Sequence, residues 1–387
     1  MPTRRLYHDD SALRRFDATV VAHVQHTGKP AVVLDATAFY PEAGGQLGDR
    51  GTLGGIEVID TQEQDGAIVH VLAGPAPEIN TRVSGELDWA RRRQHMAQHT
   101  GQHLLSGALL DRAAAATVSA RLGESALTID VQRDRIPEAE LAAAEDLAND
   151  LVDDDLAVRA WFPDAGELAS IKLRRDPKVD ADIRVVAIGD FDFSPCGGTH
   201  CARTSQLGAI RITGAERYKG MTRVTFTAAR RGRANLFTHD HVLRGLGTQF
   251  SCAPADVPAA IDKLRKDTEG VKAEITALRG QLANAIIATL PGTGPVIAAI
   301  PGDAELLRSV GAKLVSAGRD ALLCAPDDGG AAVVLFRAAG STLDCGALWK
   351  QLAAQLGGRG GGRGDRAEGR LTTPIADWAA LVSPLVS

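Results

Sequence analysis

Two short segments of this chain contain residues that bind metals, His99-Thr-Gly-Gln-His103 and Cys196-Gly-Gly-Thr-His200. In an α-helix, side chains four residues apart lie on the same face, so His99 and His103 can converge on one ion. The paired glycines of the second segment indicate a tight turn that aims Cys196 and His200 in the same direction. Three imidazoles and a thiolate are a usual ligand set for zinc. We therefore expect these four residues to bind one Zn²⁺.

A second histidine pair competes with this assignment, because His95 precedes His99 by four residues and would share the same helical face. The spacing alone leaves a pair of His95 and His99 open. The apolar residues Leu104 and Leu105 directly follow His103, which indicates that the later turn is buried and favours the pair His99 and His103. His95 is then expected to support the ligands or to face RNA.

The composition is that of an ordinary globular protein, with 44% hydrophobic and 24% charged residues in 387 positions. This length predicts two to three domains. We expect no membrane association, because no apolar run is long enough to cross a bilayer and the N-terminus lacks the apolar stretch of a signal peptide. The five cysteines are an odd number and widely scattered, which indicates reduced thiols and a cytoplasmic location.

Local basic clusters are the candidates for nucleic-acid contact, since the formal net charge of the whole chain is −5. Arginine suits phosphate because its planar guanidinium donates two parallel hydrogen bonds. The alternative for each cluster is a solvated basic surface. Some basic clusters lie close to the histidine segments and another lies among glycines, which favours contact with RNA. The predicted tRNA-binding residues are Arg91, Arg92, Arg93, Arg217, Lys219, Arg359 and Arg363.

The first ninety residues are β-rich and punctuated by glycine, which predicts a small β-barrel or sandwich over residues 1–90. Between two of the expected strands, residues 37–51 form a polar, glycine-rich loop whose backbone can approach a ligand closely. Thr37, Glu42 and Gln46 in this loop are the candidate catalytic residues. A plain connection between strands is the alternative.

Residues 91–235 are expected to form an α/β core, in which helices pack on a mostly antiparallel sheet around the two metal-binding segments. The histidine helix is expected at 91–112 and a second helix at 137–153. Strand-like runs lie on both sides of the Cys196 turn. We expect Cys201, next to His200, to be a small packing residue rather than a ligand.

A long helical arm is predicted over residues 236–290, followed by a small glycine-rich α/β domain over 291–387. The arm pairs with the helix near 233–250 or with a second protomer, so a homodimer through the arm or the C-terminal domain is a further expectation. Residues 357–369 are expected to be a basic glycine-rich loop that contacts RNA or another phosphate group, and a flexible connector is the alternative. The heptad pattern of the arm consists of Val257, Ile261, Leu264, Thr268, Val271, Ile275, Leu278 and Leu282.

The motifs together resemble a known family. His99-Thr-Gly-Gln-His-Leu-Leu, Cys196-Gly-Gly-Thr-His-Cys-Ala-Arg-Thr and Phe39-Tyr-Pro-Glu-Ala-Gly-Gly-Gln are similar to the editing domain of alanyl-tRNA synthetase. More closely, the chain resembles the free-standing alanyl-tRNA editing proteins, the AlaX group. The resemblance implies an α+β fold of four parts: the small β-barrel, the zinc-binding core, the helical arm and the C-terminal domain.

The resemblance also implies a function, the hydrolysis in trans of tRNA(Ala) wrongly carrying serine or glycine, with His99, His103, Cys196 and His200 as the zinc ligands. Thr37 and Gln46 are expected to recognise the serine hydroxyl, because a site built to hydrogen-bond a hydroxyl rejects substrates lacking it. The chain is not expected to charge tRNA. The alternatives are a non-catalytic tRNA-binding module with a structural zinc, and a phosphoesterase, which would need clustered acidic and histidine residues that the C-terminal part lacks.

Overall fold

The computed structural model of the chain describes residues 3–177 and 179–386. The chain divides into two compact units, Met1–Gly245 and Leu246–Ser387. Within the described residues, no helix combines the length and apolar character needed to span a bilayer. The predicted mixed α+β class is confirmed, while the four-part division at residues 90, 235 and 290 remains a prediction.

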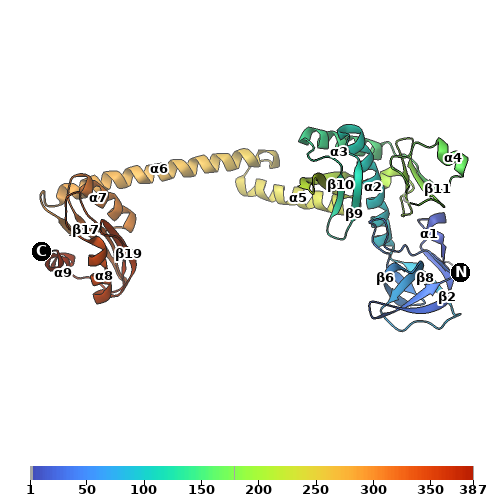
Figure 1. Cartoon of the computed structure of the whole chain (residues 1–387). Coiled ribbons are helices and arrows are strands. Elements are labelled where there is room, and N and C mark those ends of the chain that lie inside the picture. The colour runs from blue at the N-terminus through green and yellow to red at the C-terminus, as the bar shows by residue number, and fades with distance from the viewer. Residues whose placement is uncertain (1–2, 178, 387) are drawn as a thin grey trace. The chain divides into compact units, whose positions relative to one another are not determined.

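The first unit begins with a six-stranded sheet that closes into a ring in the order β2-β3-β7-β6-β5-β8 (Figure 1). Side chains of this ring, among them Phe16, Val20 and Leu53, form a hydrophobic core together with Phe39. A pair of short parallel strands and one helical turn accompany this ring. The elements are β1 (Arg4–Arg5), α1 (Leu6–Asp9), β2 (Arg15–His26), β3 (Lys29–Leu34), β4 (Ala36–Thr37), β5 (Gly51–Leu53), β6 (Ile56–Gln64), β7 (Ala67–Leu72) and β8 (Arg82–Leu87).

The rest of the first unit is an antiparallel sheet, β14-β15-β10-β9, covered by helices α2 and α3 (Figure 1). Leu104 and Leu109 of α2 and Ala144 of α3 pack against Ile129 and Phe226 of this sheet. A second sheet, β11-β12-β13, leads into the Cys196 turn. The elements are α2 (Trp89–Ala113), β9 (Thr117–Leu122), β10 (Leu127–Val131), α3 (Glu138–Asp153), β11 (Val158–Trp161), α4 (Ala165–Ser170), β12 (Val185–Ile188), β13 (Asp192–Pro195), η1 (Thr204–Leu207), β14 (Ile210–Tyr218), β15 (Met221–Ala228) and α5 (Ala229–Phe250), which crosses the boundary between the units.

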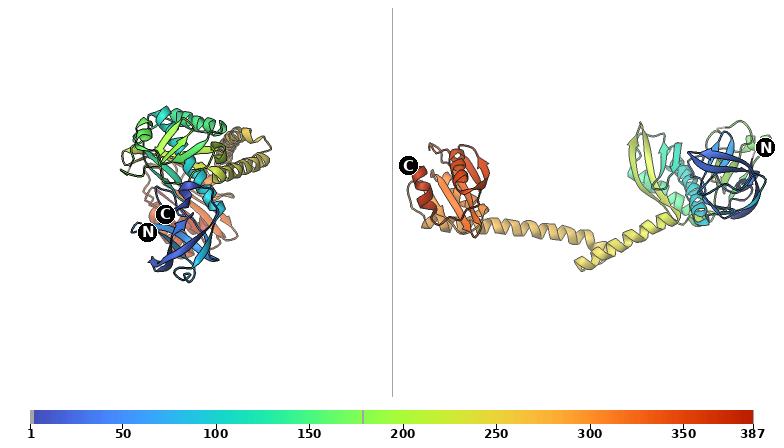
Figure 2. Two further views of the ribbon diagram at one scale, coloured as in Figure 1. Left: turned by 90° about the vertical axis from the view of Figure 1, so that its right-hand side faces the viewer. Right: turned by 90° about the horizontal axis from the view of Figure 1, so that it is seen from below.

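The second unit is built on a five-stranded sheet, β16-β17-β18-β20-β19, with helices on both faces (Figure 2). Alternation along β17 explains the two layers, because Leu322 packs toward α8 and α9 while Leu323 packs toward α7 and the end of α6. The elements are η2 (Pro254–Asp256), α6 (Val257–Thr289), β16 (Val296–Ala299), α7 (Ala304–Ser316), β17 (Ala321–Asp327), β18 (Gly330–Phe336), α8 (Cys345–Leu356), β19 (Gly358–Gly362), β20 (Arg366–Leu371), α9 (Trp378–Val382) and η3 (Ser383–Leu385).

The prediction of a loop at 357–369 is wrong, because these residues form most of the antiparallel strand pair β19 and β20. Gly360 and Gly369 lie directly opposite each other, and the indole of Trp349 packs beneath both. A Cβ at Gly360 would lie 2.7 Å from the indole, and one at Gly369 would lie 2.2 Å from it. The glycines are therefore needed for close packing rather than for flexibility.

Candidate metal centre

The structure brings the two predicted metal-binding segments together. His99 and His103 lie one turn apart on α2, and the Cys196 turn follows strand β13. The ligand atoms of His99, His103, Cys196 and His200 all lie within 4.8 Å of one another. The Cys196 Sγ is 3.5 Å from Nε2 of His99 and 3.4 Å from Nε2 of His200. This cluster does not include His95, which is buried and whose Nδ1 has no partner among the described residues.

Hydrogen bonds to the other ring nitrogen fix the tautomers of His99 and His200. The Thr100 hydroxyl donates to Met96 O, so it accepts from Nδ1 of His200, 3.1 Å away. The Gln46 Oε1 accepts from Thr199 N at 3.2 Å and from Nδ1 of His99 at 2.8 Å. Both imidazoles therefore keep their Nε2 lone pair free for a metal ion.

A buried carboxylate orients the third imidazole. Asp192, which is 1% exposed, accepts from Nδ1 of His103 at 3.3 Å and from the guanidinium of Arg174. Burial raises the pKa of Asp192, but the hydrogen bond from His103 and the charge of Arg174 outweigh it and bring this pKa to about 2. A carboxylate behind a histidine ligand is a common arrangement at zinc sites. All three histidines thus present Nε2 to one point.

Two glycines let the backbone come close enough to build this cluster. A Cβ at Gly198 would lie 2.2 Å from Cε1 of His99, so only glycine lets the turn rest on that imidazole. Gly45 has a φ of +88°, and a Cβ there would lie 2.4 Å from the carbonyl oxygen of Ala120. It brings the loop of residues 37–51 against β9 and so delivers Gln46 to His99.

The carbonyls of the Cys196 turn are held by two side chains. The Nη1 of Arg184 donates to Cys196 O at 3.1 Å and to Gly198 O at 2.9 Å. The Nε2 of His8 donates to Gly197 O at 3.3 Å. Burial and the positive charge of Arg184 together lower the pKa of His8 to about 4, so His8 is neutral near pH 7.

The two cysteines of this region have opposite character. Burial raises the pKa of the Cys196 thiol, but the imidazoles of His99 and His200 outweigh it and lower this pKa well below its usual value. Cys196 is therefore ready to act as a thiolate ligand. Cys201 is 3% exposed, and burial raises its pKa to about 12. The expectation that Cys201 is a packing residue agrees with its place beside Met96 and Ala97.

The three candidate catalytic residues lie in different surroundings. Gln46 contacts His99 of the cluster, and its Nε2 donates to the Thr199 hydroxyl at 2.9 Å. Glu42 is exposed and accepts from Gln62. Thr37 is fully buried and accepts from Phe39 N. Because Nδ1 of His70 donates to Val32 O, Thr37 donates to Nε2 of His70. Thr37 thus has one lone pair left for a substrate hydroxyl, and its role in recognition stays a prediction.

The three consecutive arginines of α2 also have different surroundings. Arg92 is 0% exposed and binds Asp49, Ser11 O and Ala38 O, so its guanidinium belongs to the interior. Arg91 donates to Gly48 O and pairs with Glu124. Arg93 is exposed and lines a cavity. Of the three, Arg93 is the most accessible to RNA.

The remaining basic candidates lie on the surface. Arg217 pairs with Asp134, and Lys219 lies 5.1 Å from the ring centroid of Tyr218. In the second unit, Arg359 is an exposed residue of β19 and Arg363 is exposed directly after that strand. Contact of any of these residues with RNA remains a prediction.

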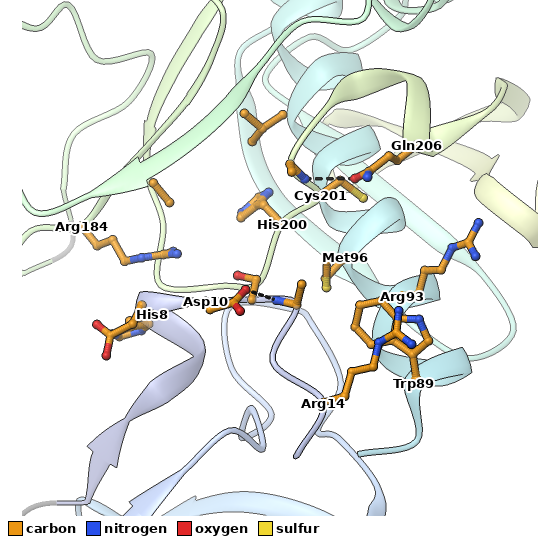
Figure 3. A pocket seen from close by; sticks show the side chains of 16 residues that line it. His8, Asp10, Arg14, Trp89, Arg93, Met96, Arg184, His200, Cys201 and Gln206 are labelled. Carbon is orange, nitrogen blue, oxygen red and sulfur yellow. Dashed lines mark hydrogen bonds between the residues drawn. The ribbon is translucent and has the colours of Figure 1, made fainter. Parts of the chain in front are cut away.

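A cavity of about 480 Å³ lies beside the cluster, with His200 in its wall (Figure 3). His8, Arg184 and Gln206 line it, and so does Trp89, on whose ring the guanidinium of Arg14 stacks at 4.2 Å. Four residues that contact the cluster were not predicted from the sequence: Arg184, Asp192, Thr100 and Thr199. Thr100 and Thr199 each neighbour a predicted ligand in the sequence, which was an available signal; Arg184 and Asp192 become significant only through the packing of β12 and β13.

Comparison with known proteins identifies relatives of this chain. Residues 183–225, which include the Cys196 turn, match the family described as the threonyl and alanyl tRNA synthetase second additional domain. Residues 9–91 match the class II (A) tRNA synthetases. The chain is 34% identical over 274 residues to the alanyl-tRNA editing protein AlaX-L of Pyrococcus horikoshii, which covers 68% of this chain and 66% of that protein. The chain is an AlaX-like protein.

This AlaX-like chain is also similar to larger enzymes. It is 30% identical over 387 residues to the alanine–tRNA ligase of Halorubrum lacusprofundi, covering 95% of this chain and 42% of the ligase. It is 33% identical over 400 residues to the ligase of Thermococcus kodakarensis, covering 98% and 43%. The chain therefore spans less than half the length of these ligases.

Proposed function

We propose that this AlaX-like chain is a trans-editing deacylase that hydrolyses the ester bond of tRNA(Ala) mischarged with serine or glycine. The observation that carries the proposal is the convergence of three imidazoles and one thiol beside a cavity whose wall includes His200. The name of the similar Pyrococcus horikoshii protein, an alanyl-tRNA editing protein, supports the choice of substrate class.

The donor set fits zinc, so His99, His103, Cys196 and His200 would hold the ion. When bound, zinc supplies a positive charge that polarises an ester carbonyl or lowers the pKa of a nearby water. Neighbouring residues of the chain hold these ligands in position. Gln46, Thr100 and Asp192 keep the imidazoles in one tautomer, and Arg184 and His8 hold the turn.

The alternative function is a non-catalytic tRNA-binding module with a structural zinc. It is favoured by the donor count, because three histidines and a cysteine complete a tetrahedral shell by themselves. One observation favours a catalytic site instead. His200 lies in the wall of a cavity of about 480 Å³.

The test is deacylation of Ser-tRNA(Ala), Gly-tRNA(Ala) and Ala-tRNA(Ala) by the wild-type protein and by Cys196→Ala. We expect hydrolysis of the seryl and glycyl esters, little hydrolysis of the alanyl ester, and loss of activity in the variant. Tight tRNA binding with no hydrolysis of any ester would support the binding module. Rapid hydrolysis of Ala-tRNA(Ala) would contradict an editing function.

A further inference from the structure

The cavity beside the metal cluster has one buried arginine in its wall, Arg184 (Figure 3). Its other charged side chains are peripheral: Arg14 and Arg93 are exposed, and Asp9 pairs with Arg4 at 3.0 Å. Asp10 accepts from Ala12 N at 2.7 Å. Arg184 differs from these residues because it is only 5% exposed.

Arg184 has no carboxylate partner among the residues that the structure describes. Burial lowers its pKa, and the groups that act against this shift are a thiol and two phenols, Cys196, Tyr40 and Tyr7. A guanidinium stays protonated in proteins, so Arg184 brings a positive charge into the wall of the cavity, and the anion beside it is the Cys196 thiolate, which a metal ion would take as a ligand. Burying a charge whose counterion is engaged elsewhere is costly unless a ligand supplies another.

The hydrogen bonds of Arg184 leave one edge of the guanidinium unused. Both Nη1 hydrogens are engaged by Cys196 O and Gly198 O. The Nε is buried and has no hydrogen-bond partner in the described chain. The Nε and Nη2 hydrogens point in parallel, which is the arrangement that binds two oxygens of one anion. The geometry therefore favours an anionic ligand with two oxygens that accept hydrogen bonds, such as a carboxylate or a phosphodiester.

The charges of an aminoacyl ester decide between these anions. A seryl or glycyl ester has a cationic amino group and no carboxylate, so its amino acid would be repelled by Arg184. The RNA that carries the ester is anionic at each phosphodiester, and arginine binds such groups bidentately. The stacked pair of Arg14 and Trp89, in the wall of the same cavity, is also suited to a nucleotide.

We propose that Arg184 binds the phosphodiester next to the terminal nucleoside of the RNA, through Nε and Nη2, while its Nη1 holds the Cys196 turn. The proposal rests on the proposed deacylase function, because it assumes an aminoacylated RNA end in the cavity. It links substrate binding to the site itself, since one guanidinium contacts both the RNA and the backbone of a metal-binding segment.

Two small esters test the contact, one without and one with a phosphodiester: seryl-adenosine and the seryl ester of the dinucleotide CpA. The measured quantity is the ratio of kcat/KM for the dinucleotide ester to that for the nucleoside ester. We expect Arg184→Gln to lower this ratio about tenfold or more, since hydrogen bonds to charged groups are strong. Arg184→Lys keeps the positive charge but loses the two parallel donors of the guanidinium. Its ratio should therefore lie between those of Arg184→Gln and the wild type.

Arg175→Gln is the matched control. Arg175 also donates to a carbonyl of this segment, Pro195 O at 3.1 Å, but it does not line the cavity. Its ratio should equal that of the wild type. An unchanged ratio in Arg184→Gln, with both esters affected equally, would overturn the proposal in favour of a product carboxylate or a purely structural arginine. The zinc content of both Arg184 variants is measured alongside, because loss of the turn geometry would lower both rates and leave the ratio unchanged, whereas loss of the phosphate contact lowers the ratio.

A binding measurement separates this proposal from the proposed function. Calorimetry with unacylated CpA and with adenosine needs no hydrolysis. If the wild type cleaves neither ester, the deacylase function fails, while preferential binding of CpA that disappears in Arg184→Gln still supports the phosphate contact. Equal affinities of wild type and Arg184→Gln for CpA would overturn it.

Discussion

Helices α2 and α6 differ in how their sequences relate to burial: α2 has many polar residues yet is mostly buried, and α6 has an apolar pattern yet is mostly exposed. The 25-residue α2 contains 17 buried residues, and many of them are polar. The 33-residue α6 has a regular apolar pattern, yet only Val257 and Ala283 are buried among its residues. The comparison teaches that the functional region of this chain is marked by polar side chains that are buried and hydrogen-bonded, rather than by an apolar stripe.

The largest effect is expected for the buried arginine of α2. Arg92→Ala should lower the free energy of unfolding by about 3–5 kcal/mol, because it leaves the Asp49 carboxylate buried without its partner. Denaturant unfolding of the first unit measures this. Arg93→Ala is the control on the same helix, and a change of about 0.5 kcal/mol or less is expected there. Equal effects of the two substitutions would contradict the interior role of Arg92.

A second prediction concerns His70, which is fully buried and bound to Thr37. Burial lowers the pKa of His70 from 6.5 to about 4, so the unfolded chain binds more protons between these values. The contribution to stability is therefore complete above pH 6.5 and is lost as the pH falls toward 4, by roughly 3 kcal/mol at most. The free energy of unfolding, measured across this pH range, should fall less in His70→Gln than in the wild type. Parallel curves of this free energy against pH would contradict the prediction.

A third prediction concerns the groups behind the metal ligands. Gln46→Ala should weaken zinc binding about 10- to 100-fold, because His99 loses the acceptor that fixes its tautomer. Competition with a chromogenic chelator measures the affinity. Gln62→Ala removes an amide that contacts Glu42 and Asp60 instead, and its zinc affinity should match the wild type. Wild-type affinity in Gln46→Ala would show that the contact does not orient the imidazole.

The smallest effect is expected on α6. Leu278, which is 55% exposed, should tolerate substitution by glutamine with a change of about 0.5 kcal/mol or less. Ala283→Leu on the same helix should cost about 1–3 kcal/mol, because Ala283 packs in the core of the second unit. A large effect of Leu278→Gln that grows with protein concentration would instead support the homodimer expected from the heptad pattern.

The sequence predicted the two metal-binding segments and their convergence, because helical spacing and a glycine turn are local properties. Spacing alone left the pair of His95 and His99 open, and only the apolar residues after His103 favoured the pair of His99 and His103. The structure separates the two pairs, because His103 lies in the cluster of possible ligands and His95 does not. Asp192 and Arg184 could not be predicted, because their roles depend on how β12 and β13 pack beside α2. The glycine strand β19 was missed because only the contact with Trp349 distinguishes it from a flexible loop.

The central claim is that the cluster on α2 and the Cys196 turn is a zinc site used for ester hydrolysis. The most direct test measures zinc content and Ser-tRNA(Ala) deacylation together, in the wild type and in Cys196→Ala. We expect about one zinc per wild-type chain and hydrolysis of the seryl ester. In the variant, both the bound zinc and the hydrolysis should be lost. A wild-type protein that binds zinc and Ser-tRNA(Ala) but leaves the ester intact would contradict it.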